Sequence, residues 1–317
     1  MMNSAASSSP TLFEKFWKQY FEEVPEVVAF GVYPFVVQLL SYWLINLPFI
    51  VYQYGKVEQQ QKSRQQHQSS ATSSPLTDSS EVEKENSSPK GTSFFANSLI
   101  QKYVSFLDHY LINPDHAPID SEFFSRILWH VTKLHFLVAL PLSVIMSLVA
   151  EPVFDRSYES LASTSLFSVL FHFLVFIICD EVLFFILHYA FHKVSFLYKH
   201  IHYFHHELRY TVSVGCEYAH PLEFLFGNIV PVLLGPFLMR THLIWYLVWI
   251  AYKLLETSYV HSGFDFKLFG YLQFGTNEHA YHHSHYQDAY GSWYGFMDMM
   301  FGTMNHFKEY SKKKKLK

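Results

Sequence analysis

The sequence predicts an all-α fold in which a polytopic bundle of helices lies in a membrane. Half of the 317 residues are hydrophobic and only 16% are charged, against about 25% in ordinary soluble domains. Several uncharged stretches approach the roughly 20 apolar residues that a membrane-spanning helix requires. The chain also has 20 histidines, and most of them lie between His188 and His306. A net charge of −4 argues against a nucleic-acid binder, and two cysteines exclude a disulfide framework.

The first 126 residues predict one membrane span between polar segments. Residues 1–26 form an N-terminal segment that lacks the pattern of a secretory signal peptide. Residues 27–51 are uncharged and predict the first span. Residues 52–93 contain a long polar tract without aromatic residues, so we expect a disordered linker that cannot bury a core. An amphipathic approach to the next span follows over 94–126.

The rest of the chain, up to the tail, predicts a membrane-embedded domain over residues 127–307. Apolar stretches at 134–150 and 164–187 predict two more spans. Between 222 and 256, two shorter apolar arms flank a polar turn. These arms fit either two crossing helices or a hairpin that does not fully cross the bilayer.

The charges around the spans predict which side each loop faces. The loop at 151–159 is net acidic, and the tail at 308–317 is rich in lysine. Other basic residues follow the first span and precede the second, namely Lys56, Lys62, Arg64, Arg126 and Lys133. Because basic loops tend to stay in the cytosol, we expect the linker, the tail and every histidine pattern to face the cytosol.

Three histidine patterns predict a metal site. They are an HxxxH over 188–192 and an HxxHH over both 202–206 and 279–283. Residues three and four apart share one face of a helix, so each pattern directs two or three imidazoles the same way. Imidazole suits iron, zinc and copper, and eight such ligands fit two ions. A chance cluster in a histidine-rich chain is the alternative. Tyr210 stands where a zinc-protease HExxH would need its second histidine, which excludes that class.

Acidic residues near these patterns are candidate partners for metal-bound histidines, which usually donate their second N–H to such groups. The nearby carboxylates are Asp180, Glu181, Glu207, Glu217, Glu223, Asp265, Glu278 and Asp288. We favour Asp180 and Glu181 because they follow a long uncharged run, and a carboxylate at such depth usually serves a site. Glu207 and Asp288 fit solvated surface acids better.

The order of the three patterns along a polytopic membrane chain resembles the fatty acid hydroxylase and sterol desaturase superfamily. Two further stretches, 217–223 (EYAHPLE) and 254–265 (LLETSYVHSGFD), and the FGT at 301–303 look like signatures of the 4-methylsterol monooxygenases. The similarity covers roughly residues 127–307.

This resemblance implies a set of metal ligands. Carried over onto this sequence, the ligands are His188, His192, His202, His205, His206, His279, His282 and His283. His261, in the HSG element, is implied as a further ligand. His220, followed by a proline, fits either a ligand or a structural turn residue.

The resemblance also implies an activity. The chain is expected to be a non-haem di-iron monooxygenase in the endoplasmic reticulum that oxidises the C4 methyl group of 4-methyl and 4,4-dimethyl sterols with O2. Electrons would come from NAD(P)H through cytochrome b5 and its reductase, alongside other enzymes of sterol C4 demethylation. Sterol C5 desaturation and hydroxylation of fatty acids or sphingoid bases are alternatives within the superfamily. A membrane protein that holds zinc or copper without redox chemistry is the alternative from another class.

The C-terminal lysines carry a separate signal. Lys314 and Lys315 occupy the fourth and third positions from the C-terminus, as in the di-lysine retrieval signals of endoplasmic reticulum membrane proteins. Such terminal motifs are addresses that a receptor reads. A basic end attracted to anionic lipid is the other interpretation.

Overall fold

A computed structural model of the protein describes residues 9–72, 92–113, 119–150, 153–266, 275–292 and 295–315. Within these ranges the chain forms helices joined by short loops, with two isolated bridges and no β-strand. The all-α prediction is therefore confirmed.

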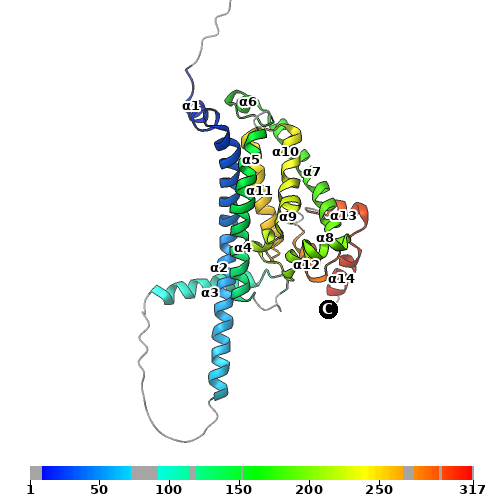
Figure 1. The fold of residues 1–317 in the computed structure, drawn as a ribbon. Coiled ribbons are helices and arrows are strands. Elements are labelled where there is room, and N and C mark those ends of the chain that lie inside the picture. Colours follow the sequence, from blue (N-terminus) through cyan, green and yellow to red (C-terminus); the bar gives the residue numbers. More distant parts are fainter. Residues whose placement is uncertain are drawn as a thin grey trace, which may run out of the picture.

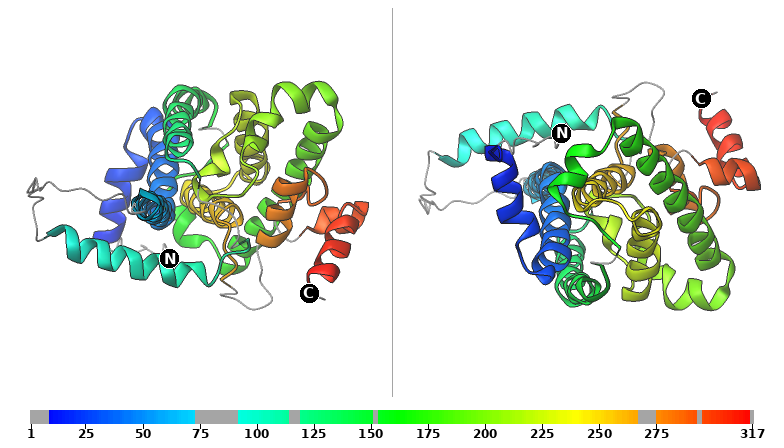
Figure 2. Two further views of the ribbon diagram at one scale, coloured as in Figure 1. Left: turned by 90° about the horizontal axis from the view of Figure 1, so that it is seen from below. Right: turned by 90° about the horizontal axis from the view of Figure 1, so that it is seen from above.

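Long helices that run side by side form the body of the molecule (Figures 1 and 2). They are α2 (Tyr33–Thr72), α4 (Ser121–Leu134), α5 (Leu140–Ala150), α7 (Leu166–Lys193), α10 (Val230–Met239) and α11 (Leu243–Val260). Helix α2 packs along α11, and α7 packs along α10. Short π-helical segments extend several of these helices, namely η2 (Val27–Val32), η3 (His135–Ala139) and η6 (Phe224–Ile229).

Further helices lie at the two ends of this bundle (Figure 1). At one end lie α1 (Leu12–Trp17), followed by η1 (Lys18–Glu22), and α6 (Tyr158–Ser163). The opposite end carries α3 (Thr92–Asp108), α8 (Ser195–His200), α12 (Thr276–His285), α13 (Phe296–Phe301) and α14 (Asn305–Lys315). The chain between α8 and α10 adds η4 (His202–Glu207), η5 (Ser213–Glu217) and α9 (Pro221–Glu223).

Four helical stretches in the described ranges are long and apolar enough to cross a membrane. They are Val27–Gln65, Ser121–Leu148, Leu166–Lys193 and Pro221–Met239. The third of these exposes large apolar side chains over several turns, with Leu166 73% and Phe167 80% exposed. Such a surface is unfavourable in water but suits the hydrocarbon of a bilayer. The protein is therefore a multi-pass membrane protein.

The first part of the region expected to be a disordered linker is helical instead. Helix α2 continues without a break through residues 52–72, which were predicted to be unfolded. Glutamine, glutamate and lysine are good helix formers, and the first turns of this stretch also pack against α3, where Tyr52 is buried. The remainder of that linker, residues 73–91, lies outside the described residues.

The two arms predicted between 222 and 256 both belong to the bundle. The first arm ends at Arg240, whose φ of 47° turns the chain, and α11 then runs back. The Leu243 N–H donates to the Asp155 carbonyl at 2.7 Å, and the His242 side chain accepts from the N–H of Ile244. These bonds fix the turn beside the loop that follows α5. The C-terminal end of α11 therefore lies beside α12, at the end of the bundle opposite this turn.

A buried polar contact ties α2 to the segments that surround the histidines. Asn46 is fully buried, and its amide donates to the Ser258 hydroxyl at 3.0 Å. Its side-chain oxygen accepts from the Ser213 hydroxyl at 2.5 Å. Nearby, the Tyr42 hydroxyl donates to the Val214 carbonyl at 2.7 Å. These bonds hold α11 and η5 in register with α2.

Candidate metal centre

The nine histidines implied as ligands lie at one end of the bundle, on four separate segments of the chain. His188 and His192 stand one turn apart on α7, and His261 caps the C-terminus of α11. The other six come from η4 and α12, three from each. The side chains form two groups, within each of which the candidate ligand atoms lie within 4.8 Å of one another.

The first group has five members, namely His188, His192, His202, His206 and His282. The Nε2 atom of His192 lies 2.7 Å from that of His202, 3.1 Å from that of His206 and 3.1 Å from that of His282. These imidazoles therefore direct the same ring nitrogen toward one point.

The second group has four members, namely His205, His261, His279 and His283. The Nε2 atom of His279 lies 2.8 Å from that of His261 and 3.1 Å from that of His283. His205 Nε2 is 3.4 Å from His261 Nε2. The four rings are buried.

Backbone carbonyls fix the protonation of most of these rings. In five histidines Nδ1 faces a carbonyl oxygen at 2.7–3.1 Å: His188 faces Tyr290, His205 Tyr218, His261 Thr257, His282 Asp288 and His283 Leu208. A carbonyl can only accept, so Nδ1 carries the proton and Nε2 presents a lone pair. The close contacts between Nε2 atoms therefore cannot all be hydrogen bonds, and a cation is the partner that such converging lone pairs lack.

The spacing of the nitrogens also suits a metal ion. Bonds from a metal to imidazole nitrogen are about 2.0–2.1 Å long, so two ligands at right angles on one ion lie about 3 Å apart. The distances between Nε2 atoms, 2.7–3.1 Å in the first group and 2.8–3.4 Å in the second, agree with this value. Burial lowers the pKa of His205 to about 4 and that of His261 to about 3. Both are therefore neutral at pH 7, the form that binds metals.

The carboxylate of Glu223 contacts a histidine of the first group. The Nδ1–H of His202 donates to Glu223 Oε1 at 2.6 Å. Metal-bound histidines commonly have such a partner, which orients the ring and raises its basicity. Glu223 was among the eight nearby acids but was not favoured from the sequence.

The carboxylates that the sequence favoured, Asp180 and Glu181, have other contacts. Asp180 Oδ2 forms an ion pair with Lys253 Nζ at 2.7 Å, and Glu181 Oε1 lies near the N–H of Met297. The role of Asp180 and Glu181 as partners of metal-bound histidines therefore stays a prediction.

His220 lies in neither group. Its Nδ1 accepts the Leu222 N–H at 3.2 Å and so caps α9, which agrees with the structural turn residue that was one of its two interpretations. Glu207 and Asp288 were expected to be solvated surface acids, but both accept hydrogen bonds from other residues of the protein. Glu207 accepts from the Tyr218 hydroxyl at 2.9 Å, and Asp288 accepts the N–H of His306 at 2.7 Å.

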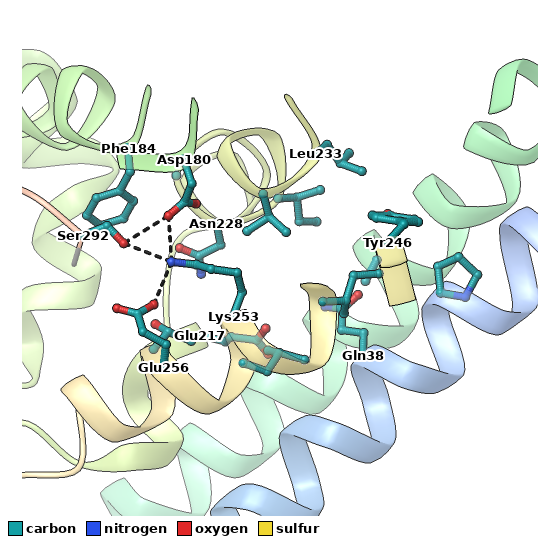
Figure 3. Close-up of a pocket in the computed structure, with 18 of the residues that line it drawn as sticks. Gln38, Asp180, Phe184, Glu217, Asn228, Leu233, Tyr246, Lys253, Glu256 and Ser292 are labelled. Atoms are coloured by element: carbon teal, nitrogen blue, oxygen red, sulfur yellow. Dashed lines mark hydrogen bonds and ion pairs between the residues drawn. The ribbon is translucent and has the colours of Figure 1, made fainter. Parts of the chain in front are cut away.

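A large cavity runs through the bundle to the second group. Its walls come from α2, α5, α7, α10 and α11, and it encloses about 1170 Å³ of empty space, open solvent included. Phe30 and Phe154 line one end, and His261 and His279 line the other. Most of the wall is apolar, but Lys253 and the acids Asp180, Glu217 and Glu256 also line it (Figure 3).

A second buried pair of a histidine and a carboxylate, besides His202 and Glu223, was not predicted from the sequence. His135, in η3, lies with its Nε2 2.5 Å from Glu217 Oε2, and both side chains are buried. His135 falls outside the three histidine patterns, so no spacing signal could have identified it. Glu217 lines the cavity.

Comparison with known proteins agrees with this site. The fatty acid hydroxylase family model matches residues 173–303, which include all nine histidines of the two groups. A Dictyostelium discoideum protein that bears the name "putative methylsterol monooxygenase" is 31% identical over 218 residues, 67% of this chain and 77% of that protein.

Two further relatives differ in the activity that their names state. Methylsterol monooxygenase 1 of Rattus norvegicus is 29% identical over 218 residues, which is 68% of this chain and 73% of the rat protein. A very-long-chain aldehyde decarbonylase of Oryza sativa subsp. japonica is 33% identical over 199 residues, 61% of this chain and 72% of that protein. No solved structure matches the chain. The predicted resemblance is thus confirmed, and the chain belongs to the fatty acid hydroxylase family.

Proposed function

We propose that this protein is an iron-dependent membrane monooxygenase that oxidises the C4 methyl group of 4-methyl and 4,4-dimethyl sterols. Successive oxidations convert the methyl group to an alcohol, an aldehyde and a carboxylate, as in C4 demethylation during sterol biosynthesis. Two of the relatives described above are named as methylsterol monooxygenases, and the sequence signatures at 217–223 and 254–265 point the same way.

The observation that carries this proposal is the cavity that ends at His261 and His279. A rigid, largely apolar lipid that enters the cavity from the bilayer places one end beside a metal group. The apolar walls desolvate the substrate and keep water from the reacting carbon. A protein that only stores or transports metal has no need for such a cavity.

The metal groups are proposed to hold two iron ions. Bound iron would activate dioxygen for attack on an unactivated C–H bond, which side chains alone cannot perform. The protein supplies the neutral imidazoles, fixes their tautomers through the backbone carbonyls and orients His202 through Glu223. The sequence has no flavin-binding or nicotinamide-binding motif. Electrons are therefore proposed to come from NAD(P)H through cytochrome b5 and its reductase.

The test compares membranes that carry the wild-type chain, His205→Ala, or His200→Ala as a matched control. His200 lies at the same end of the bundle but is exposed and belongs to neither group. Each membrane receives a 4,4-dimethylsterol, NADH and oxygen, and products are identified by mass spectrometry. Sterols with 4-hydroxymethyl or 4-carboxy groups in the wild type and the His200→Ala variant, but not in His205→Ala, would support the proposal. No turnover with active cytochrome b5 present would refute it.

Other substrates in the same assay separate the alternatives. Fatty acids, sphingoid bases and long-chain aldehydes test hydroxylation and the decarbonylation that the rice relative's name states. A sterol lacking C4 methyl groups tests C5 desaturation. Iron content and oxygen consumption distinguish an oxygenase from a zinc- or copper-binding protein without redox chemistry.

The protein is proposed to reside in the endoplasmic reticulum membrane with its histidine groups and C-terminus in the cytosol. Within the described residues, Lys314 Nζ donates to the Ile112 carbonyl at 3.2 Å. Replacing Lys314 and Lys315 with alanine should move a tagged protein out of the endoplasmic reticulum if they form a retrieval signal. Unchanged localisation would favour lipid attraction of the tail.

A further inference from the structure

A small polar cluster lines the cavity close to the second histidine group. We call it the polar floor and define it as Asp180 of α7, Lys253 and Glu256 of α11, and Ser292 (Figure 3). Lys253 Nζ lies 2.7 Å from Asp180 Oδ2 and 2.7 Å from Glu256 Oε2. It also donates to the Ser292 hydroxyl oxygen at 3.1 Å, and this hydroxyl donates to Asp180 at 3.2 Å.

Keeping these charges inside the bundle is costly. The Lys253, Asp180 and Glu256 side chains are only 10%, 6% and 3% exposed. Moving each charge out of water costs several kcal/mol, and well-packed apolar residues often stabilise a core as well or better. Ionisable groups at such depth usually face a substrate path or another functional site. The polar floor does face the cavity.

The polar floor carries more negative than positive charge. Three carboxylates line the cavity, those of Asp180, Glu217 and Glu256, and Lys253 is the one lysine or arginine among the described lining residues. A lipid carboxylate placed here would be repelled. A hydroxyl group, in contrast, can donate to an acid and accept from Lys253.

The polar floor also lies at the right place along the cavity. Glu256 precedes His261 by five residues on α11, about 7.5 Å along the helix axis at 1.5 Å per residue. The Thr257 carbonyl, next to Glu256, accepts the His261 Nδ1–H at 2.9 Å. A lipid whose hydroxyl is held at the polar floor therefore has its neighbouring carbons near the second group. In a 4-methylsterol, the hydroxyl-bearing carbon C3 is bonded to C4.

We infer that the polar floor binds the hydroxyl group of a lipid alcohol and discriminates against lipids that end in a carboxylate. This rests on the proposed function in one respect: for a 4-methylsterol the bound group is the 3β-hydroxyl, which positions C4 for oxidation. Asp180, Lys253 and Glu256 are then positioning and specificity residues of the substrate site.

Direct ligand binding tests the inference without turnover. The full-length protein in lipid nanodiscs is equilibrated with 4,4-dimethylcholesterol, its 3-deoxy analogue or oleic acid, and bound ligand is quantified by mass spectrometry. We expect the alcohol to bind about 10- to 100-fold more tightly than the 3-deoxy analogue, the size expected for a hydrogen bond to a charged group. Oleic acid should bind more weakly than the alcohol. Equal binding of the alcohol and its 3-deoxy analogue by the wild type would overturn the inference, and no variant is needed to see it.

Variants then assign the preference to the polar floor. Lys253→Met and Glu256→Gln should lose most of the preference for the hydroxyl, and Glu256→Gln should gain affinity for oleic acid because one negative charge is removed. The control is Lys56→Met, which breaks the 3.1 Å ion pair of Lys56 with Asp108 away from the cavity. It should keep the wild-type preference. Retention of the full preference in folded Lys253→Met and Glu256→Gln would contradict the assignment.

Failure of this inference can be told from failure of the proposed function. If C4 oxidation occurs but the 3-deoxy analogue binds as well as the alcohol, the polar floor has been misassigned and the proposed function stands. If the hydroxyl preference holds but no C4 product forms, the proposed reaction is wrong and the inference survives for another lipid alcohol.

Discussion

Glu223 offers a direct test of how the protein holds its metal. The carboxylate accepts from His202 Nδ1–H at 2.6 Å, and its Oε2 has no hydrogen-bond partner among the described residues. Replacing Glu223 with leucine leaves a buried N–H unpaired, at a cost of about 1–3 kcal/mol. Loss of a histidine's carboxylate partner typically weakens metal binding about 10- to 100-fold, or about 1.4–2.8 kcal/mol. The two ranges of free energy agree, so we expect the metal affinity of Glu223→Leu to be about 10- to 100-fold weaker than that of the wild type.

The assay is a competition titration of the purified protein with Fe²⁺ or Zn²⁺ against a chelator of known affinity, with bound metal measured by mass spectrometry. Glu223→Gln keeps an acceptor oxygen and should lose less affinity than Glu223→Leu. The control is Glu207→Gln, because Glu207 adjoins His206 but contacts Arg126 and Tyr218 instead of a histidine. A folded Glu223→Leu protein with wild-type metal affinity would refute the reasoning.

Three further predictions concern stability. Removing the metal with a chelator should lower the melting temperature in detergent, because converging Nε2 lone pairs then repel one another; an unchanged melting temperature would contradict this. Asn46→Ala should destabilise the fold by about 1–3 kcal/mol, because it leaves buried groups such as the Ser213 hydroxyl without their hydrogen-bond partner. Thermal unfolding measures this change, and the control Ser41→Ala, on the same helix, should show little change. In the metal-free protein, His205 and His261 have pKa values of about 4 and 3, below the ordinary 6.5. The unfolded chain therefore takes up more protons below pH 6.5, and the free energy of unfolding should fall as the pH drops from 6.5 toward 4, by at most about 1.4 kcal/mol per pH unit for each group. Denaturant titrations across this range measure the slope, and a flat profile would count against buried neutral imidazoles.

The sequence predicts the general fold well because the bilayer imposes strong rules. Uncharged stretches near the length of a span can only be buried helices or lipid-facing ones, and the structure places helices at each of them. The prediction failed at 52–72, where polar residues predominate. Helix α2 continues there because these residues favour a helix and because its first turns pack against α3, with Tyr52 buried and its hydroxyl donating to Asp108 at 2.7 Å.

The site was predictable only in part, for a geometric reason. The spacing of the histidines and the family resemblance together point to nine side chains that the structure gathers in two groups. The spacing could not divide them, because His205 and His206 are adjacent in sequence yet belong to different groups. Nor could it identify Glu223, which lies 21 residues from the ring that it contacts. Contacts between distant segments depend on how the helices pack, and a local pattern does not encode them.

The way in which the histidines are shared has a consequence for assembly. Segment η4 contributes His202 and His206 to the first group and His205 to the second, whereas α12 contributes His282 to the first group and His279 and His283 to the second. The first ion to bind therefore immobilises both segments and orders most of the ligands for the second. The conformational entropy of η4 and α12 is lost when the first ion binds and is not lost again when the second ion binds. Metal uptake should therefore be sigmoidal, and protein with a single bound ion should be scarce. A mutation in either group would then empty both, and the nine histidines would behave as one unit.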